Sequence, residues 1–174
     1  FHDGTNFATC LRQVAETGIP RLRFMTSHPW DFSSDMLEVI ASHPNIMKCI
    51  HLPLQSGNDE ILAQMGRRYT RQKYLDLVKE IREKIPGCAI TTDIIVGFPN
   101  ENEEQFNDTL TLCEEVKYDA AFTFLYSPRK GTPAAAMKDN VPDSVKHERF
   151  NRLLKVIEAG VMSHSKEMVG KTYS

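Results

Sequence analysis

The stretch "CIHLPLQSGNDEIL", residues 49–62, begins like a buried strand and ends like a helix. Between the two lies the polar corner Gln55-Ser56-Gly57. A strand that passes through a polar corner into a helix is typical of a parallel β/α unit, in which functional residues lie at the carboxyl end of the strand. The stretch therefore predicts both a fold class and the position of a site.

The same pattern occurs three more times along the chain. Further apolar runs of strand length span residues 21–25, 89–98 and 120–126. Segments with apolar residues at helical spacing lie between the runs, and a long final helix is predicted from about residue 144 to 168. This alternation predicts an α/β protein with four parallel strands, either in part of a β/α barrel or in an open doubly wound sheet. No GxGxxG motif follows a strand, which disfavours a dinucleotide-binding sheet.

All four predicted strands end in polar or Gly/Pro-rich segments. In both architectures these ends meet at one edge of the sheet. A single segment of this kind would be ordinary loop chemistry, but four together predict a polar rim that holds a ligand. The segments are Thr26-Ser27-His28, Gln55-Ser56-Gly57, residues 97–101 and residues 127–132.

Composition places few further limits on function. The 41% apolar and 25% charged residues are ordinary for a soluble globular domain, and the net charge of −2 argues against nucleic-acid binding by bulk electrostatics. No stretch reaches the roughly 20 apolar residues of a membrane span. The four cysteines, none in CxxC spacing, favour reduced thiols in a cytoplasmic enzyme over a metal centre.

Charge is uneven along the chain. Residues 67–84 hold seven Lys or Arg and three acids, whereas residues 100–119 hold seven acids and one lysine. Such runs are usually solvated helix faces, and the alternative is a basic surface that binds RNA.

Two other kinds of chemistry fit parts of the predicted rim. His28 and His51 follow neighbouring strands and Asp93 lies on the next, which is the pattern of a barrel metallohydrolase. That chemistry needs three or more ligands and an open metal position, and no carboxylate accompanies His28. The serines at the strand ends lack a nucleophile-elbow context, so they are predicted to donate hydrogen bonds to a ligand.

Four strings in this order resemble the radical S-adenosylmethionine (SAM) methylthiotransferases, and they favour the branch that modifies tRNA. The resemblance extends from about Arg21 to the end and implies an α/β fold, the last four β/α units of a partial TIM-like (β/α)6 radical SAM barrel. The barrel part would span residues 1–142, and residues 143–174 would form a helix leading towards a missing TRAM domain. The strings are "TSHPWDF" (26–32), "HLPLQSGNDEILAQMGRRYT" (51–70), "DIIVGFPNENEEQF" (93–106) and "YSPRKGTPAA" (126–135).

The resemblance also implies an activity and its cofactors. Members of the tRNA branch add a methylthio group to C2 of N6-isopentenyladenosine at position 37 of tRNA, using SAM and two [4Fe–4S] clusters. The cluster ligands would lie in a missing N-terminal part, so this chain contributes no metal ligands and is expected to be inactive alone. The chain begins without Met and stops in what resembles the opening of a strand, so we expect a piece of a longer polypeptide.

Individual residues receive roles from the same resemblance. Gln55 and Ser56 would meet the ribose or methionine part of SAM, and the strand around Asp93 would lie against its adenine. By position instead, Arg67 and Arg68 would bind phosphates of the implied tRNA, because the predicted basic helix that carries them starts near the rim. The family's "GFPGET" reads "GFPNEN" here, so Asn100 fills a glycine position, and Asn tolerates positive φ better than most residues. The predicted cofactor-binding residues are Thr26, Ser27, Gln55, Ser56, Asp93, Ile95, Gly97 and Arg129.

Overall fold

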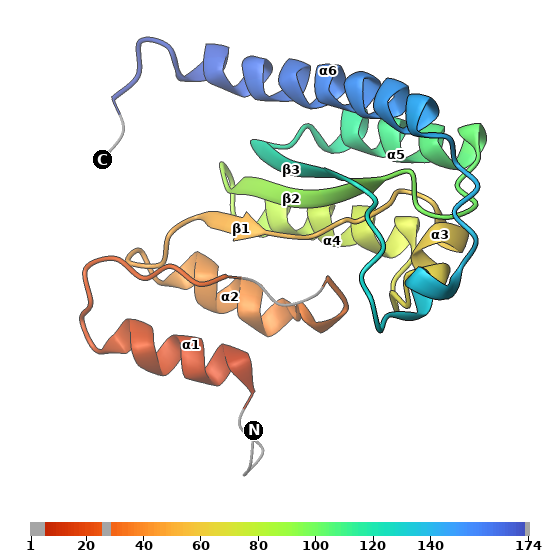
Figure 1. The fold of residues 1–174 in the computed structure, drawn as a ribbon. Coiled ribbons are helices and arrows are strands. Elements are labelled where there is room, and N and C mark those ends of the chain that lie inside the picture. The colour runs from red at the N-terminus through yellow and green to blue at the C-terminus, as the bar shows by residue number, and fades with distance from the viewer. Residues whose placement is uncertain (1–5, 26–28, 173–174) are drawn as a thin grey trace.

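Three parallel strands form the sheet, and their order in space follows their order in the chain. The computed structural model describes residues 6–25 and 29–172 (Figure 1). The strands are β1 (Cys49–His51), β2 (Ala89–Val96) and β3 (Ala120–Leu125). The parallel pairing confirms the β/α units that the sequence predicted.

The predicted strand at residues 21–25 is wrong as a full strand. Leu22 makes one parallel bridge to Ile46, in which its N–H donates to the Asn45 carbonyl at 2.8 Å. The segment alternates exposed and half-buried residues, and among the described residues no strand pairs with its other side. A segment held by one bridge lacks the repeated hydrogen bonds that would extend a ladder. It therefore occupies the position of a first strand without forming one.

Helices follow the strands and cap their own starts. Side chains of Asn6, Asn58, Thr70 and Asn102 accept hydrogen bonds from backbone N–H groups in the first turns, which satisfies donors that a helix leaves unpaired. The described α-helices are α1 (Phe7–Glu16), α2 (Ser34–Ser42), α3 (Asp59–Gln64), α4 (Arg71–Lys84), α5 (Glu103–Val116) and α6 (Asp143–Met168), with 3-10 turns η1 (Pro29–Asp31) and η2 (Pro133–Ala136).

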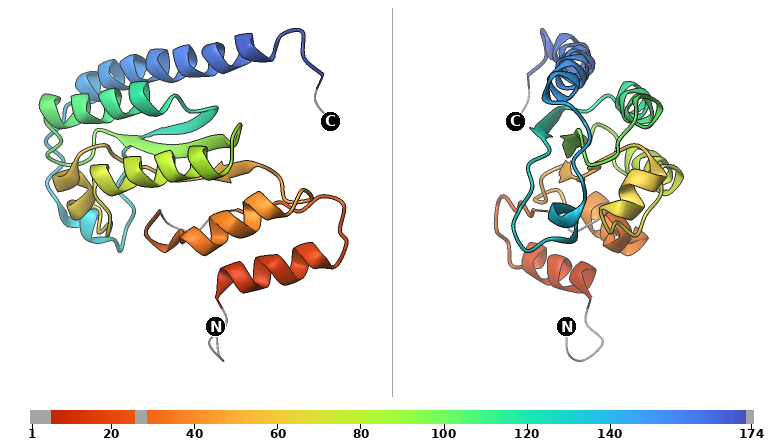
Figure 2. Two further views of the ribbon diagram at one scale, coloured as in Figure 1. Left: turned by 180° about the vertical axis from the view of Figure 1, so that it is seen from behind. Right: turned by 45° about the vertical axis from the view of Figure 1, so that its right-hand side comes forward.

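The helices bury one face of the sheet and leave the other face open. In the right-hand view of Figure 2, α4 and α5 lie on the same side of the strands. Along β2, residues 90, 92, 94 and 96 are buried while those between them are half-buried. The strand register puts Cys49, His51, Thr91, Asp93, Ile95, Phe122 and Phe124 on the second face, which is called the open face below.

Helix α6 begins and ends almost where the sequence predicted. It packs against β3 and α5, and Leu153 and Ile157 on it enter the main core. The division of the chain at residues 142 and 143 falls at the start of this helix and stays a prediction, although α6 shares the core of the sheet. Within the described residues, every helix is too short or too polar to cross a bilayer.

Candidate functional site on the open face

A polar pair lies at the centre of the open face. His51 Nε2 is 3.3 Å from Asp93 Oδ2, and His51 Nδ1 is 2.9 Å from the Thr91 hydroxyl. The His51 ring also meets the ring of Phe122 edge to face, with 6.2 Å between centroids. Both nitrogens of the imidazole are therefore engaged, and its orientation is fixed by groups on two neighbouring strands.

Exposed apolar side chains lie beside this pair. Phe122 and Phe124 are 60% and 51% exposed, and in the register they stand opposite Asp93 and Ile95 on β2. A carboxylate accepts hydrogen bonds, and aromatic rings offer flat apolar surface. The arrangement can bind a flat heterocycle that carries an amino group.

The Gln55 corner continues the pairing of β1 after His51. Gln55 has a φ of 67°, its N–H donates to the Asp93 carbonyl at 2.8 Å, and its carbonyl accepts from Ile95 N–H at 3.0 Å. Its side chain is buried. The corner thus holds β1 against the part of β2 that carries two predicted site residues.

The next two residues of the corner face the helices. Ser56 is fully buried, with its hydroxyl 3.4 Å from the Thr109 hydroxyl on α5, so it packs against the helices and not on the open face. Gly57 donates its N–H to the same Thr109 oxygen at 2.9 Å. A Cβ on Gly57 would lie 2.6 Å from the Asp108 carbonyl oxygen, so only glycine allows this approach. A hydrogen-bonding corner is needed here because it attaches the strand end to α5.

Gly97 also makes a close approach, but to the protein itself. With φ of 74°, it would place a Cβ 2.5 Å from Cγ of Lys146 on α6, and its N–H donates to Glu101 Oε2 at 2.9 Å. Asn100 adopts φ of 69°, as expected for a residue at a glycine position. Sequence reasoning identified Gly97 but missed Lys146, because the two residues lie on distant segments.

Glu101 fixes the loop that follows β2. The Arg149 guanidinium is 3.2 Å from its carboxylate and donates at 2.9 Å to its backbone carbonyl. Burial raises the pKa of Glu101 to about 6, although the Gly97 N–H and the Arg149 charge act in the opposite direction. Helix α6 therefore determines the shape of a strand end that the sequence assigned to cofactor binding.

The remaining predicted residues are scattered or lie outside the described part. Arg129 is exposed in the loop after β3, where its carbonyl accepts from the Thr132 hydroxyl at 2.8 Å. Thr26 and Ser27 lie outside the described residues, as does His28 of the metallohydrolase hypothesis.

The two arginines predicted to bind tRNA do not lie on a helix. Arg67 and Arg68 form part of the turn between α3 and α4, and the Arg68 guanidinium is 5.3 Å from the centre of the Trp30 ring. Arg71, which does begin α4, donates to the Asp108 carbonyl and lies 3.9 Å from Glu115. The basic segment is thus divided between a turn near Trp30 and a helix whose first arginine packs on α5.

The described residues include no group of three or more His, Cys, Asp or Glu side chains that could hold a metal ion. His51 and Asp93 form a pair only, which gives the metallohydrolase hypothesis no further support. Cys88 and Cys113 are buried, and burial raises the pKa of the Cys88 thiol to about 12. A thiol with such a pKa is a poor ligand or nucleophile near neutral pH.

Phe122, Phe124 and Thr91 were missed as site residues by sequence reasoning. The signal was present, because phenylalanines two residues apart on a strand share one face. Only the arrangement of the helices on the sheet shows which face of the strand stays open.

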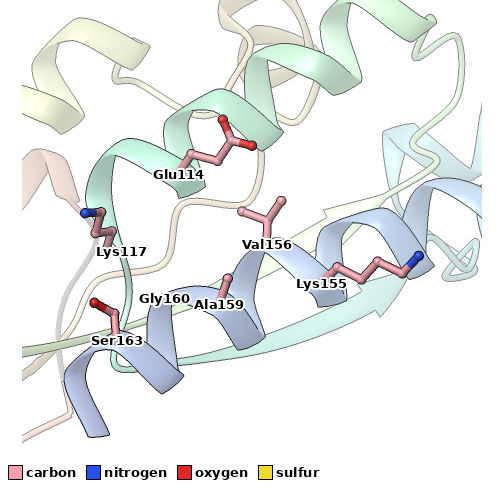
Figure 3. A pocket seen from close by; sticks show the side chains of 7 residues that line it. All are labelled: Glu114, Lys117, Lys155, Val156, Ala159, Gly160 and Ser163. Atoms are coloured by element: carbon pink, nitrogen blue, oxygen red, sulfur yellow. The ribbon is translucent and has the colours of Figure 1, made fainter. Parts of the chain in front are cut away.

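A groove of about 410 Å³ lies on the helical side of the molecule, between α5 and α6 (Figure 3). None of the residues assigned from the sequence lines it. Figure 3 shows Gly160 at this helix crossing, where a Cβ would lie 3.4 Å from Lys117 Cα. The groove follows from close helix packing and is separate from the open face.

Comparison with known proteins relates this fold to one enzyme superfamily. Residues 5–113 match the Radical SAM superfamily. The chain is 59% identical over 147 residues to the tRNA-2-methylthio-N(6)-dimethylallyladenosine synthases of Staphylococcus aureus strains JH9 and Newman, covering 84% of this chain. It spans only 29% of the length of those relatives.

Solved structures agree on the fold. Coproporphyrinogen III oxidase from Escherichia coli, described as a radical SAM enzyme, aligns with a TM-score of 0.71 at 18% identity, covering 90% of this chain and 38% of the other. A radical S-adenosylmethionine methyltransferase from Kitasatospora setae aligns with a TM-score of 0.59 at 17% identity, covering 74% and 26%. At these identities the likeness concerns the fold alone.

Proposed function

Because this chain belongs to the Radical SAM superfamily, we propose that it is part of the barrel of a tRNA methylthiotransferase. The enzyme would add a methylthio group to C2 of N6-isopentenyladenosine at position 37 of tRNA. The observation that carries the proposal is the 59% identity, over 84% of this chain, to synthases named for a 2-methylthio-N6-dimethylallyladenosine product. Identity of that order extends well beyond a shared fold.

The open face fits a part of SAM. Exposed Phe122 and Phe124 offer flat apolar surface, and the Asp93 carboxylate next to them accepts hydrogen bonds, which matches an aminopurine. SAM bound with a reduced cluster would supply the radical chemistry. The residues of this chain would bind and orient the cofactor and keep water from it.

The predicted cofactor-binding residues would make different kinds of contact. Asp93 and Ile95 would contact the cofactor with their side chains, and Gln55 and Gly97 would do so with their backbone. Arg129, which is exposed after β3, would pair with a carboxylate or a phosphate. Thr26 and Ser27 remain assigned from the sequence alone, as polar residues at a predicted strand end.

The iron–sulfur clusters do not fit the described residues of this chain. Its four cysteines have no cluster spacing, and the described side chains provide no group of three potential ligands. Both clusters would be held by other parts of the longer polypeptide, which spans more than this chain in the relatives. We derive no step for residues of this chain at a cluster.

The partners follow from the proposed reaction. The substrate would be tRNA, bound in part by Arg67 and Arg68, and the same polypeptide would contain an N-terminal cluster domain and a C-terminal TRAM domain. Modification of tRNA would take place in the cytoplasm.

The test uses the longer polypeptide with its clusters reconstituted. It is incubated with SAM, a reductant and tRNA that carries isopentenyladenosine, and the nucleosides are analysed by mass spectrometry. We expect 2-methylthio-isopentenyladenosine at position 37. Isopentenyladenosine that stays unchanged despite intact clusters and SAM cleavage would reject the tRNA substrate. An Asp93→Ala variant provides a control for the open face, because it should lower product formation without loss of iron.

A further inference from the structure

A second groove, of about 430 Å³, lies between the 3-10 turn η1 and helix α4. Its volume falls within the roughly 300–1,000 Å³ range of small-ligand sites. Trp30 and Arg68 form part of its wall, and Lys73 comes from the first turn of α4. None of the open-face residues lines it, so it is a separate site.

Among the side chains that line the groove, Trp30 has an exposed aromatic ring. Trp30 is 38% exposed, and the Arg68 guanidinium lies 5.3 Å from its ring centre. Tyr69, which also lines the groove, is buried and donates its hydroxyl hydrogen to the Leu54 carbonyl at 2.7 Å. This bond ties the wall of the groove to the corner segment that follows β1.

The charges of the groove are separated along its length. Arg68 and Lys73 lie near the start of α4, and Lys73 makes no ion pair within residues 6–25 and 29–172. The acidic end is already neutralised, because Glu80 lies 3.0 Å from Lys84 and accepts from the Ser34 hydroxyl at 2.5 Å. These two groups lower the pKa of Glu80. Asp76 also lines the groove, and its carboxylate accepts from the Gln72 side-chain amide at 2.9 Å. Arg68 and Lys73 outnumber this one carboxylate, so the excess charge near the tryptophan ring is positive.

We propose that this groove binds one unpaired nucleotide of the RNA substrate, near the base that is modified. The base would stack on Trp30, and the adjoining phosphate would contact Arg68 and Lys73. The inference rests on the proposed tRNA substrate and adds a specific subsite to it. An aromatic ring beside cationic side chains is the combination by which proteins bind single-stranded nucleic acid. A bound protein segment could pack on the Trp30 ring, but it would not require the cations near the start of α4.

The test measures binding of a fluorescein-labelled anticodon stem-loop to the full-length enzyme by fluorescence anisotropy. Trp30→Ala should weaken binding about tenfold through lost stacking. Trp30→Phe, which keeps a ring, should restore most of it. Lys73→Ala should weaken binding and reduce the slope of log affinity against log salt by about 0.7 to 0.9. Trp30→Phe should leave that slope unchanged.

Lys79→Ala is the matched control, since Lys79 lies on the same helix, outside the groove and near Glu83 at 3.9 Å. It should bind RNA like the wild type. If the wild type binds while Trp30→Ala and Lys73→Ala both match Lys79→Ala, the subsite is wrong and the proposed function stands. If Trp30→Ala changes the oligomeric state and not RNA affinity, the groove is a protein contact. A wild-type enzyme that binds no RNA would reject the proposed function and the subsite together.

Discussion

At the residue scale, the open face depends on how His51 and Asp93 hold each other. His51 is engaged through both ring nitrogens, by Thr91 and by Asp93, while the Asp93 side chain remains 28% exposed. The imidazole therefore orients the carboxylate, and the carboxylate has surface left for a ligand. Asp93 and Ser56 are both predicted to bind the cofactor, but one is partly exposed and the other is buried. Replacing them should therefore have opposite effects on SAM affinity.

Replacing Asp93 by Ala in the full-length enzyme should weaken SAM binding by roughly 10- to 100-fold, because a charged hydrogen-bond acceptor is lost. Iron content should stay that of the wild type. Ser56→Ala is the comparison: its buried hydroxyl faces Thr109, so it should lower the free energy of unfolding by about 1 kcal/mol and leave SAM affinity unchanged. Equilibrium dialysis with SAM and a denaturant titration measure the two quantities. Loss of iron with normal SAM affinity in Asp93→Ala would contradict its assigned role.

At the scale of elements, α6 controls the loop after β2 through the buried pair Arg149–Glu101. Glu101 is 4% exposed, and burial raises its pKa to about 6 from an ordinary value of 4.5. A carboxyl whose pKa is higher in the folded protein favours folding at low pH. That contribution is complete below about pH 4.5 and is lost as pH rises through about 6.

We therefore expect the free energy of unfolding of the wild type, relative to Glu101→Gln, to fall by roughly 2 kcal/mol at most between about pH 4.5 and pH 6. Urea titrations at several pH values measure it. Glu104→Gln, at an exposed position in the first turn of α5, serves as the control and should follow the wild type. A difference between wild type and Glu101→Gln that grows with pH would contradict the sign of the shift.

The turn between α3 and α4 is the second element with a testable role. Replacing Arg67 and Arg68 together by Ala in the full-length enzyme should weaken tRNA binding and flatten its salt dependence by about one to two units, since each phosphate contact contributes about 0.7 to 0.9. Affinities measured across a salt series give the slope. An unchanged slope would assign both arginines to a solvated surface. Lys79→Ala, on the exposed side of α4, should not alter it.

At the scale of the whole molecule, the number of hydrogen bonds that hold each strand differs from one edge of the sheet to the other. β2 pairs with both neighbours, whereas the segment at residues 21–25 is held by the single Leu22 bridge and by ring contact between Phe7 and Phe24. Few hydrogen bonds and little burial mean a low free energy of local opening. The edge beside β1 is therefore the weak side of this sheet.

Amide hydrogen exchange on the 174-residue chain should show that difference. Amides of residues 21–25 should exchange far faster than those of Ile90 to Val96, which open only with the whole core. In the longer polypeptide we expect slower exchange at residues 21–25, because a neighbouring strand would cover an edge that is otherwise open. Equal protection of both segments in the 174-residue chain would contradict this expectation, because residues 21–25 would then be held as firmly as a full strand.

Much of this architecture is determined by the sequence alone. The apolar runs, the capping residues Asn58, Thr70 and Asn102, and the span of α6 are local signals, since propensity and hydrogen bonds to the nearest turn decide them. The positive φ of Asn100 followed from its position in a motif in the same way. The four sequence motifs and their order likewise indicate the family from the sequence alone.

Only the tertiary structure decided which of the predicted site residues lie on the open face of the sheet. Ser56 and Asp93 are both predicted cofactor-binding residues, yet one packs on Thr109 of α5 and the other on His51 of β1. Gly97 proved to make room for Lys146, which is far away in the chain. Side chains on a strand alternate between two faces, and a sequence does not state which face the helices will cover. That choice comes from the packing of the helices on the sheet, and it gave this protein its open face.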